Sequence, residues 1–356
     1  MDFYTEYKEK PDNESFSVSA DYENLELIRR RFPPVPAELV EFIKTGSRFI
    51  IAGHREPDGD CVGSQLALRS AVIRLGKEAL VYSPGPFSRT ELRNYADRFD
   101  EIPPDYLSDD LKLIIVDCTS KERIGDKITA LEGLSMAIID HHASASHSKS
   151  SVDFPVYIDP EAPSCTVLVF KLITALGLKL TDEEATLLLF GLCTDTGFFR
   201  HLTERNADVF EASAKMVRYG ASPKNVFYIT NGGKSIGSRI LMGRVLSRAE
   251  PHFNGKVIIS YETLEDCNSF GMLNRDSDSL YQMLMTVDGV QAVVIIRQEL
   301  ADNCTVSLRS LDTVNVAEIA SSFGGGGHKN AAGLTMKGDI SFVKQKILES
   351  FKKTFN

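Results

Sequence analysis

The sequence predicts an α/β protein in which a doubly wound, mainly parallel sheet is joined by a helical linker to a smaller α/β domain. Three observations carry this prediction. The first half of the chain alternates short apolar runs of strand length with longer segments of helical periodicity. Two runs, 111–116 and 136–139, are apolar throughout apart from Lys112, as in parallel strands that are covered on both faces. The chain of 356 residues is also long enough for two domains, each with its own core.

The elements of the first domain follow one another in the order that right-handed crossovers produce. A polar extension at 1–36, closed by a proline-rich stretch, precedes a domain at 37–220. Thr181 and Glu184 form the capping-box pattern of a helix start. The predicted elements are strands at 48–53, 79–83, 111–116 and 136–139, a helix at 62–75, and helices beginning at Ser164, Thr181 and Thr203.

The pattern of predicted elements changes near residue 221. We expect a helical linker at 221–247 and a second α/β domain at 248–356. The predicted elements of that domain are a strand at 256–261, a hairpin from 291–297 and 305–309, a short helix begun by Asn315, a glycine loop, and an amphipathic helix at 341–355.

Composition narrows the classes of function. The net charge of −9 and the pI near 5.4 argue against binding to duplex nucleic acid, where basic surface dominates affinity. The six cysteines are isolated, which excludes zinc-ribbon and dithiol-redox patterns. The polar start has no secretory pattern, and the apolar runs are too short to cross a bilayer, so a cytoplasmic protein without a membrane partner is expected.

Acidic and imidazole side chains collect where the predicted strands end, which is the ligand-binding edge of a doubly wound sheet. They are His54, Asp58, Asp60, Asp117, Asp140, His141 and His142, with Asp195 after the helix that begins at Thr181. Some have ordinary alternative explanations: Asp60 as a helix N-cap, and Asp117 as a turn residue. His141 and His142 are adjacent, so their side chains diverge, and only one can ligate a given ion. The other is left for acid–base or phosphate contact.

Taken together, these candidate residues indicate a metal site with two ions. Several carboxylates and imidazoles on one rim fit two divalent ions about 3.5–4 Å apart, bridged by one carboxylate. Mixed ligands of this kind suit Mn²⁺. Such a pair generates a hydroxide nucleophile at neutral pH and stabilises charge on a phosphoryl oxygen, so the predicted reaction is phosphoester or phosphoanhydride hydrolysis.

The second domain contributes a run of four glycines followed by His328 and the small residues 331–333. The backbone N–H groups of such a run can approach an anion closely, and His328 adds a donor or a positive charge. Arg309 ends a predicted strand and is a candidate phosphate contact, with an ordinary surface arginine as the equal alternative.

Together these stretches resemble the DHH phosphoesterase superfamily with its DHH-associated C-terminal domain. The matching patterns are HxxPDGDxxGS at 54–64, the strand-ending Asp117, the triplet at 140–142, TDTG at 194–197, and GGGGHxxAAG at 324–333. The resemblance starts near residue 40 and reaches the end of the chain. It points to the branch of nanoRNases, pAp phosphatases and phosphodiesterases acting on cyclic di-AMP or pApA.

The resemblance implies two Mn²⁺ ions, with Mg²⁺ or Co²⁺ as alternatives, in a cleft between the domains. The ligands of one ion would be His54, Asp58 and Asp117. The ligands of the other would be Asp60, His141 and Asp195, with Asp117 bridging both ions. His142 would act off the metals, as general acid for the leaving oxygen or as a contact to the scissile phosphate, and Asp140 is expected to orient this loop. The rest of the nucleotide would be held by Arg309, Gly325, Gly326, Gly327 and His328.

The leading functional hypothesis is a Mn²⁺-dependent hydrolase that releases 5′-nucleoside monophosphates from short oligoribonucleotides or from linear or cyclic dinucleotides. The first alternative is a pAp phosphatase, because a terminal 3′-phosphate presents similar atoms to the metals. The second is a catalytically silent nucleotide sensor, which predicts a damaged ligand set that this sequence does not have. The family resemblance is also compatible with a homodimer.

Overall fold

The computed structural model describes residues 33–103, 106, 110–119, 121–129, 133–142, 154–271, 275–311 and 313–355. The chain divides into two compact units, with the division after Gly232. The predicted linker contains α8 (Pro223–Asn231) and α9 (Ile236–Ser247), one on each side of this division. The predicted N-terminal extension lies outside the described residues up to residue 32.

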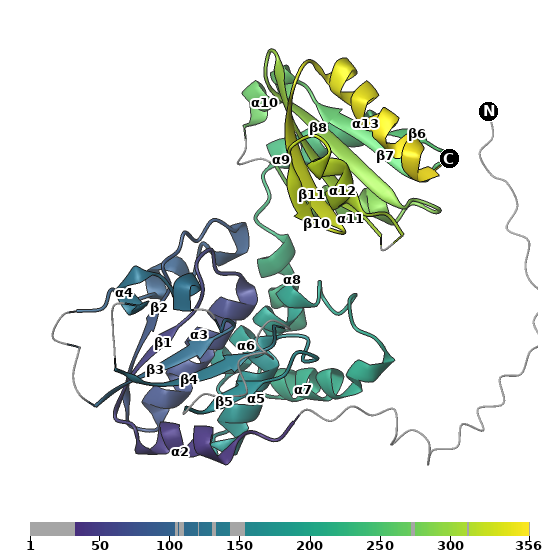
Figure 1. Ribbon diagram of the computed structural model, residues 1–356. Coiled ribbons are helices and arrows are strands. Elements are labelled where there is room, and N and C mark those ends of the chain that lie inside the picture. The colour runs from purple at the N-terminus through teal and green to yellow at the C-terminus, as the bar shows by residue number, and fades with distance from the viewer. Residues whose placement is uncertain are drawn as a thin grey trace, which may run out of the picture. The chain divides into compact units, whose positions relative to one another are not determined.

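The first unit is built on a five-stranded parallel sheet, which confirms the predicted fold class (Figure 1). Its strands are β1 (Arg48–Ala52), β2 (Glu78–Tyr82), β3 (Leu111–Val116), β4 (Ser135–Asp140) and β5 (Val156–Ile158). Their order is β2-β1-β3-β4-β5, so the direction of winding reverses between β1 and β3. Such a switch point is where ligands bind in open α/β sheets.

Helices cover both faces of this sheet, which explains the continuous apolar runs of its strands. One face carries Phe49 and Ile51 of β1 and the larger helices, and the other carries Ile50 and the short α4. The helices of the larger layer are α2 (Ala37–Thr45), α3 (Gly59–Arg74), α5 (Cys165–Ala175), α6 (Asp182–Asp195) and α7 (Ala207–Arg218). The shorter elements are α4 (Asp126–Thr129) and the 3₁₀ turns η1 (Thr90–Leu92), η2 (Ala96–Arg98), η4 (Lys121–Ile124) and η6 (Glu204–Asn206).

The second unit is a six-stranded mixed sheet in the order β10-β11-β9-β8-β7-β6 (Figure 1). Its strands are β6 (Glu250–His252), β7 (Val257–Glu262), β8 (Ala292–Leu300), β9 (Asn303–Ser310), β10 (Gly326–His328) and β11 (Ala331–Lys337). Its helices besides α9 are α10 (Leu264–Phe270), α11 (Ser277–Met285), α12 (Val316–Ser321) and α13 (Ile340–Phe355). α12 and α13 pack against one face, and α9 and α11 against the other.

Two local expectations have clear outcomes. The capping box of Thr181 and Glu184 is present at the start of α6. The predicted glycine loop is wrong in part, because residues 326–328 pair with β11 as an antiparallel hairpin. None of the helices in the described part of the chain is long and apolar enough to span a bilayer.

Candidate active site

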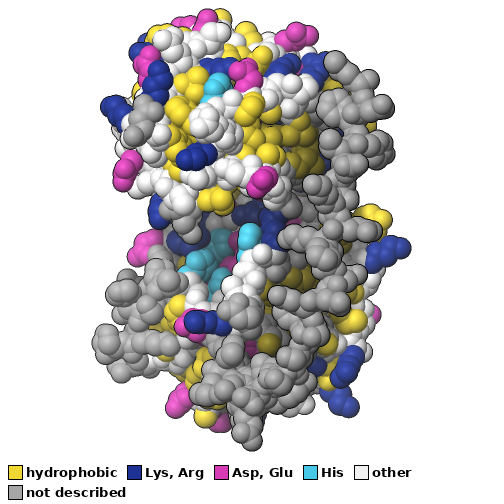
Figure 2. Space-filling model, turned by 90° about the vertical axis from the view of Figure 1, so that its right-hand side faces the viewer, with side chains coloured by type: hydrophobic (Ala, Val, Ile, Leu, Met, Phe, Trp, Pro, Cys, Tyr) yellow, Lys and Arg dark blue, Asp and Glu magenta, His cyan; other side chains and the backbone are white. Residues whose placement is uncertain are grey.

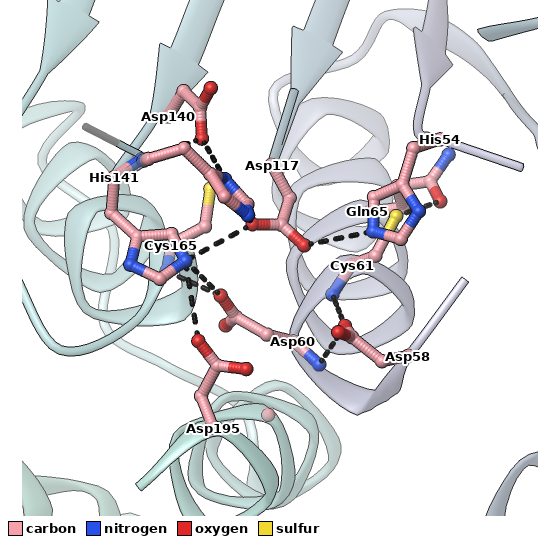
Figure 3. Close-up of polar contacts among 12 residues, drawn as sticks. His54, Asp58, Asp60, Cys61, Gln65, Asp117, Asp140, His141, Cys165 and Asp195 are labelled. Carbon is pink, nitrogen blue, oxygen red and sulfur yellow. Dashed lines mark hydrogen bonds and ion pairs between the residues drawn. The ribbon is translucent and has the colours of Figure 1, made fainter. Parts of the chain in front are cut away.

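The acidic and imidazole side chains predicted to cluster do converge at the carboxyl edge of the first sheet (Figure 3). β1 leads to His54, β3 to Asp117 and β4 to His141. Asp60 lies in the first turn of α3, and Asp195 is the last residue of α6 rather than a residue after it. The site therefore combines three strand ends with two helix ends.

Asp117 lies between the two histidines that face the site. Its Oδ2 atom is 3.3 Å from His54 Nε2, and its Oδ1 atom is 3.3 Å from His141 Nε2. His141 Nε2 is also 3.6 Å from Asp60 Oδ2 and 3.2 Å from Asp195 Oδ2. The two oxygens of Asp117 thus face two adjacent ligand groups, as a bridging carboxylate must.

The backbone at Asp117 adopts an uncommon conformation, with a φ of 59°. A non-glycine residue in this left-handed region costs about 1 kcal/mol or more, and such positions concentrate at functional sites. Its N–H donates to the carbonyl of Ile139 at 2.9 Å, which ties the end of β3 to β4. The strained turn aims the carboxylate into the site instead of continuing the strand.

Asp60 is fixed by the start of another helix. Its two oxygens accept from the backbone N–H groups of Cys165 at 2.5 Å and Thr166 at 2.8 Å, in the first turn of α5. Unpaired N–H groups at a helix start favour an anion, so α5 holds this fully buried carboxylate in one orientation. Gly191 of α6 permits the arrangement, because an added Cβ would lie 2.9 Å from the Cα of Asp60.

Asp58, not Asp60, is the N-cap of α3. One oxygen, Oδ1, accepts from the N–H groups of Asp60 and Cys61 at 3.1 Å each. The alternative that gave the cap to Asp60 is therefore wrong. Capping occupies one oxygen of Asp58 and leaves Oδ2 as the atom with which it could ligate an ion.

Asp140 orients His142 rather than facing the other carboxylates. Its Oδ1 accepts from the backbone N–H groups of His141 and His142 and lies 2.8 Å from His142 Nδ1. This contact favours a proton on Nδ1, so Nε2 is the ring nitrogen that is left for a substrate. The His142 side chain is 41% exposed, against 15% for His141. Histidine side chains gather on the face drawn in Figure 2.

The site carries more negative charge than its own residues neutralise. Burial, followed by the charge of Asp117, raises the pKa of Asp60, and burial followed by the charge of Asp60 raises that of Asp195. Burial lowers the pKa of His141, but the close contact of its Nε2 with Asp117 and the charges of the nearby acids outweigh this and raise it to about 10. Buried carboxylates that repel one another are a suitable environment for cations.

The residues present fit divalent metal ions. Asp117 Oδ1 is buried and receives no hydrogen bond of good geometry, although Oδ1 is a strong acceptor. Three groups of side chains place potential ligand atoms within 4.8 Å of one another. They are His54, Cys61 and Asp117; Asp117, His141 and His142; and Asp60, His141 and Asp195. Asp58 belongs to none of the three, since its hydrogen bonds to Asp60 and Cys61 direct it to the α3 N-terminus.

Cys61 and the α5 N-terminus were missed by sequence reasoning. The Cys61 thiol is fully buried beside His54 and Asp117, and burial raises its pKa well above its usual range. The only sequence signal was its position next to Asp60, which is also the position of an ordinary helix residue. The contact between Asp60 and Cys165 joins residues 105 positions apart, and no local sequence pattern predicts it.

Two of the predicted substrate-binding residues of the second unit, Arg309 and His328, share one face of its sheet. Arg309 pairs with Ala331, and Ala331 pairs with His328, so the three side chains form a row across β9, β11 and β10. Gly327 in this hairpin has a φ of 144°, and an added Cβ would lie 2.4 Å from the carbonyl oxygen of Ala331. Only glycine fits there, and its backbone stays accessible next to His328, which is exposed.

Both units match known protein families. Residues 48–192 match the model described as "DHH family, N-terminal domain", and residues 254–356 match the "DHHA1 domain". The first match contains His54, Asp58, Asp60, Asp117, His141 and His142, and the second contains Arg309 and the glycine hairpin.

Two curated relatives cover most of this chain. A Thermus thermophilus protein named bifunctional oligoribonuclease and PAP phosphatase NrnA is 32% identical over 307 residues, which is 85% of this chain and 89% of that protein. The cyclic-di-AMP phosphodiesterase GdpP of Geobacillus thermodenitrificans is 25% identical over 334 residues, 89% of this chain but 49% of GdpP. The chain thus spans about half of the second relative.

Among solved structures, an exopolyphosphatase-related protein from Bacteroides fragilis matches with a TM-score of 0.71. Its sequence is 23% identical, and the match covers 89% of this chain and 96% of that one. At this level of identity the match supports the fold alone.

Proposed function

The chain belongs to the DHH family of phosphoesterases and is a hydrolase, and we propose that it cleaves short oligoribonucleotides or linear and cyclic dinucleotides such as pApA and cyclic di-AMP. The products would be 5′-nucleoside monophosphates. The observation that carries the proposal is the position of Asp117 between His54 and His141, surrounded by further carboxylates.

The DHH family is metal-dependent, and we assign two Mn²⁺ ions to this site. His54, Asp58 and Asp117 would hold one ion. Asp60, Asp117, His141 and Asp195 would hold the other. When bound, such a pair of ions activates water and offsets charge on the phosphoryl oxygens. The chain's own contribution is to fix these ligands before substrate arrives, through the α5 N-terminus behind Asp60 and the strained turn at Asp117.

His142 is the group with which the protein would move a proton. The hydrogen bond to Asp140 raises the pKa of His142, which keeps a larger fraction of the ring protonated near neutral pH. With Nδ1 held by Asp140, Nε2 is the atom that would donate to the leaving oxygen. Asp140 acts as a positioning residue, in the way a buried acid orients a catalytic imidazole.

The proposed nucleotide contacts lie in the second unit. Arg309 would pair with phosphate oxygens, and the hairpin of Gly326 and Gly327 would let the same anion approach its backbone closely. Gly325 would support this hairpin rather than bind the anion, because its N–H donates to the carbonyl of Ala320 at 2.9 Å. His328 projects from the same sheet face as Arg309. Hydrolysis of pAp is the second candidate, because the NrnA relative carries both activities in its name.

One parallel assay tests the proposal. The purified protein with Mn²⁺ is offered pApA, cyclic di-AMP, pAp, RNAs of two to ten nucleotides and pyrophosphate, and the products are separated by chromatography. We expect the highest kcat/KM for a dinucleotide or short RNA, with 5′-monophosphates as products. His142→Ala should lower kcat by about 100-fold or more, as loss of a general acid does.

Glu349→Gln changes an exposed carboxylate on α13 and is the matched control, expected to behave as wild type. Preference for pAp over every dinucleotide would favour the second candidate. Absence of hydrolysis of any substrate would contradict the proposed activity.

A further inference from the structure

The sheet face that carries Arg309 continues into a buried polar network. Arg297 of β8 is 6% exposed and donates to Glu262 at 2.9 Å, to Ser307 Oγ at 2.9 Å and to Ser277 Oγ at 3.1 Å. Ser307 and Arg309 are two positions apart on β9, so their side chains leave the strand on the same face. This network fixes the strand segment from which Arg309 projects.

Tyr281 of α11 joins that network to the Arg309 side chain. Its hydroxyl donates to the carbonyl of Ser307 at 3.0 Å, and only 5% of the residue is exposed. Burial raises the pKa of Tyr281, so the hydroxyl keeps the proton that it donates. The guanidinium of Arg309 lies over the tyrosine ring, 5.0 Å from its centroid.

The ring contact restricts how an anion can reach Arg309. The guanidinium carbon lies over the Tyr281 ring, so that side of the group is occupied, and Nη1 donates to the carbonyl of Leu308 at 3.0 Å. The other N–H donors lie in the plane of the group, along its edge. An edge-on approach is the geometry in which arginine binds two oxygens of one phosphate.

We propose that Tyr281 is a positioning residue that holds the Arg309 guanidinium edge-on toward a phosphate of the substrate. The inference rests on the proposed function, since it assigns Arg309 to nucleotide binding. It predicts that Tyr281 affects binding of the nucleotide and leaves the hydrolytic step in the first unit unchanged.

Steady-state kinetics of Tyr281 variants test the role. Tyr281→Leu removes the ring but keeps apolar bulk, so KM for pApA should rise about five- to tenfold while kcat stays within about twofold. Tyr281→Phe keeps the ring that stacks on Arg309 and should restore most of the wild-type KM. Thermal unfolding of both variants shows whether the second unit remains folded.

A double-mutant cycle separates positioning from packing. If Tyr281 acts through Arg309, the leucine variant should raise KM in the wild-type background and have little effect in an Arg309→Ala background. An equal rise in both backgrounds would mean that Tyr281 merely supports the core, and would overturn the inference. An Arg309→Ala variant with unchanged KM would overturn it as well.

The affinity for 5′-AMP, measured by calorimetry, tests the role of Tyr281 independently of whether the protein hydrolyses the proposed substrates. AMP binding that weakens in both Arg309→Ala and Tyr281→Leu, in a protein that hydrolyses none of the substrates, would support the inference and contradict the proposed function. Hydrolysis of pApA with an unchanged KM and unchanged AMP affinity in Tyr281→Leu would overturn the inference alone.

Discussion

Two clusters of buried carboxylates, one in each unit, are neutralised in opposite ways. In the second unit, Asp266 accepts from Arg244 and Arg248, and the pair Arg275 and Arg297 neutralises Glu262. In the first unit, no lysine or arginine among the described residues forms an ion pair with any site carboxylate. Those carboxylates are Asp58, Asp60, Asp117 and Asp195.

The pKa shifts of Asp60 and Asp195 are opposite in sign to that of Asp266, whereas hydrogen bonds from His141 and His54 outweigh burial and lower the pKa of Asp117 to about 2. Hydrogen bonds from Arg248 and Arg244 outweigh burial and hold the pKa of Asp266 far below its usual range. Burial and neighbouring acids instead raise the pKa of Asp60 and Asp195. A cluster that its own residues neutralise is structural, whereas a cluster left with excess charge is completed by a ligand.

The largest expected effect comes from breaking the first cluster. Asp117→Asn removes the carboxylate that faces both His54 and His141, and should lower kcat/KM by about 1,000-fold, or about 4 kcal/mol of transition-state stabilisation. Initial rates on pApA with saturating Mn²⁺ measure this change, with Glu349→Gln as control. Activity within tenfold of wild type would rule out a bridging role for Asp117.

Breaking the second cluster should affect stability and not metal binding. Asp266→Asn leaves Arg244 and Arg248 without their common anionic partner and should lower the free energy of unfolding of the second unit by about 3 kcal/mol. The value lies at the low end for a buried pair because the Arg244 side chain is 43% exposed. Urea unfolding checks it, and a loss below about 1 kcal/mol would show that the pair is dispensable.

Metal should stabilise the first unit alone. Mn²⁺ at about 100 times its dissociation constant should add about 2.7 kcal/mol to the free energy of unfolding of the unit that binds it. Calorimetric scans with Mn²⁺ and with EDTA would show this as a shift of one transition. An equal shift of the unfolding transitions of both units would contradict the expectation that only the first unit binds metal.

Low pH should lower the free energy of unfolding of the second unit by protonating Asp266 and weakening its ion pairs with Arg244 and Arg248. Because the pKa of Asp266 is lowered by folding, its contribution is present at neutral pH and declines below the unfolded value, about 4. The stability difference between wild type and Asp266→Asn should therefore shrink between pH 5 and about pH 3. Midpoints of urea unfolding at these pH values measure the trend, and a constant difference would refute the linkage.

The sequence was sufficient for the fold class and for most of the residues that converge, although not for Cys61. Apolar runs located the strands, and parallel strands bring their carboxyl ends to one edge, so His54, Asp117 and His141 could be grouped without coordinates. The capping box at Thr181 was equally local and equally predictable.

Features that depend on long-range contact were not predictable. The α5 N-terminus meets Asp60 only because α3, α5 and α6 pack closely, and no pattern near residue 60 encodes this. Asp58 and Asp60 are both plausible caps, and the choice depends on where the helix begins. The glycine run has a loop composition, and its pairing with β11 is set by the partner strand.

Direct counting of bound metal tests the central claim, which is that divalent ions complete the first cluster and that the second is complete without them. Equilibrium binding of Mn²⁺ should give two ions per chain in the wild type and in Asp266→Asn, and a large loss of affinity in Asp117→Asn. Failure of the wild-type protein to bind Mn²⁺, or unchanged binding in Asp117→Asn, would contradict the account.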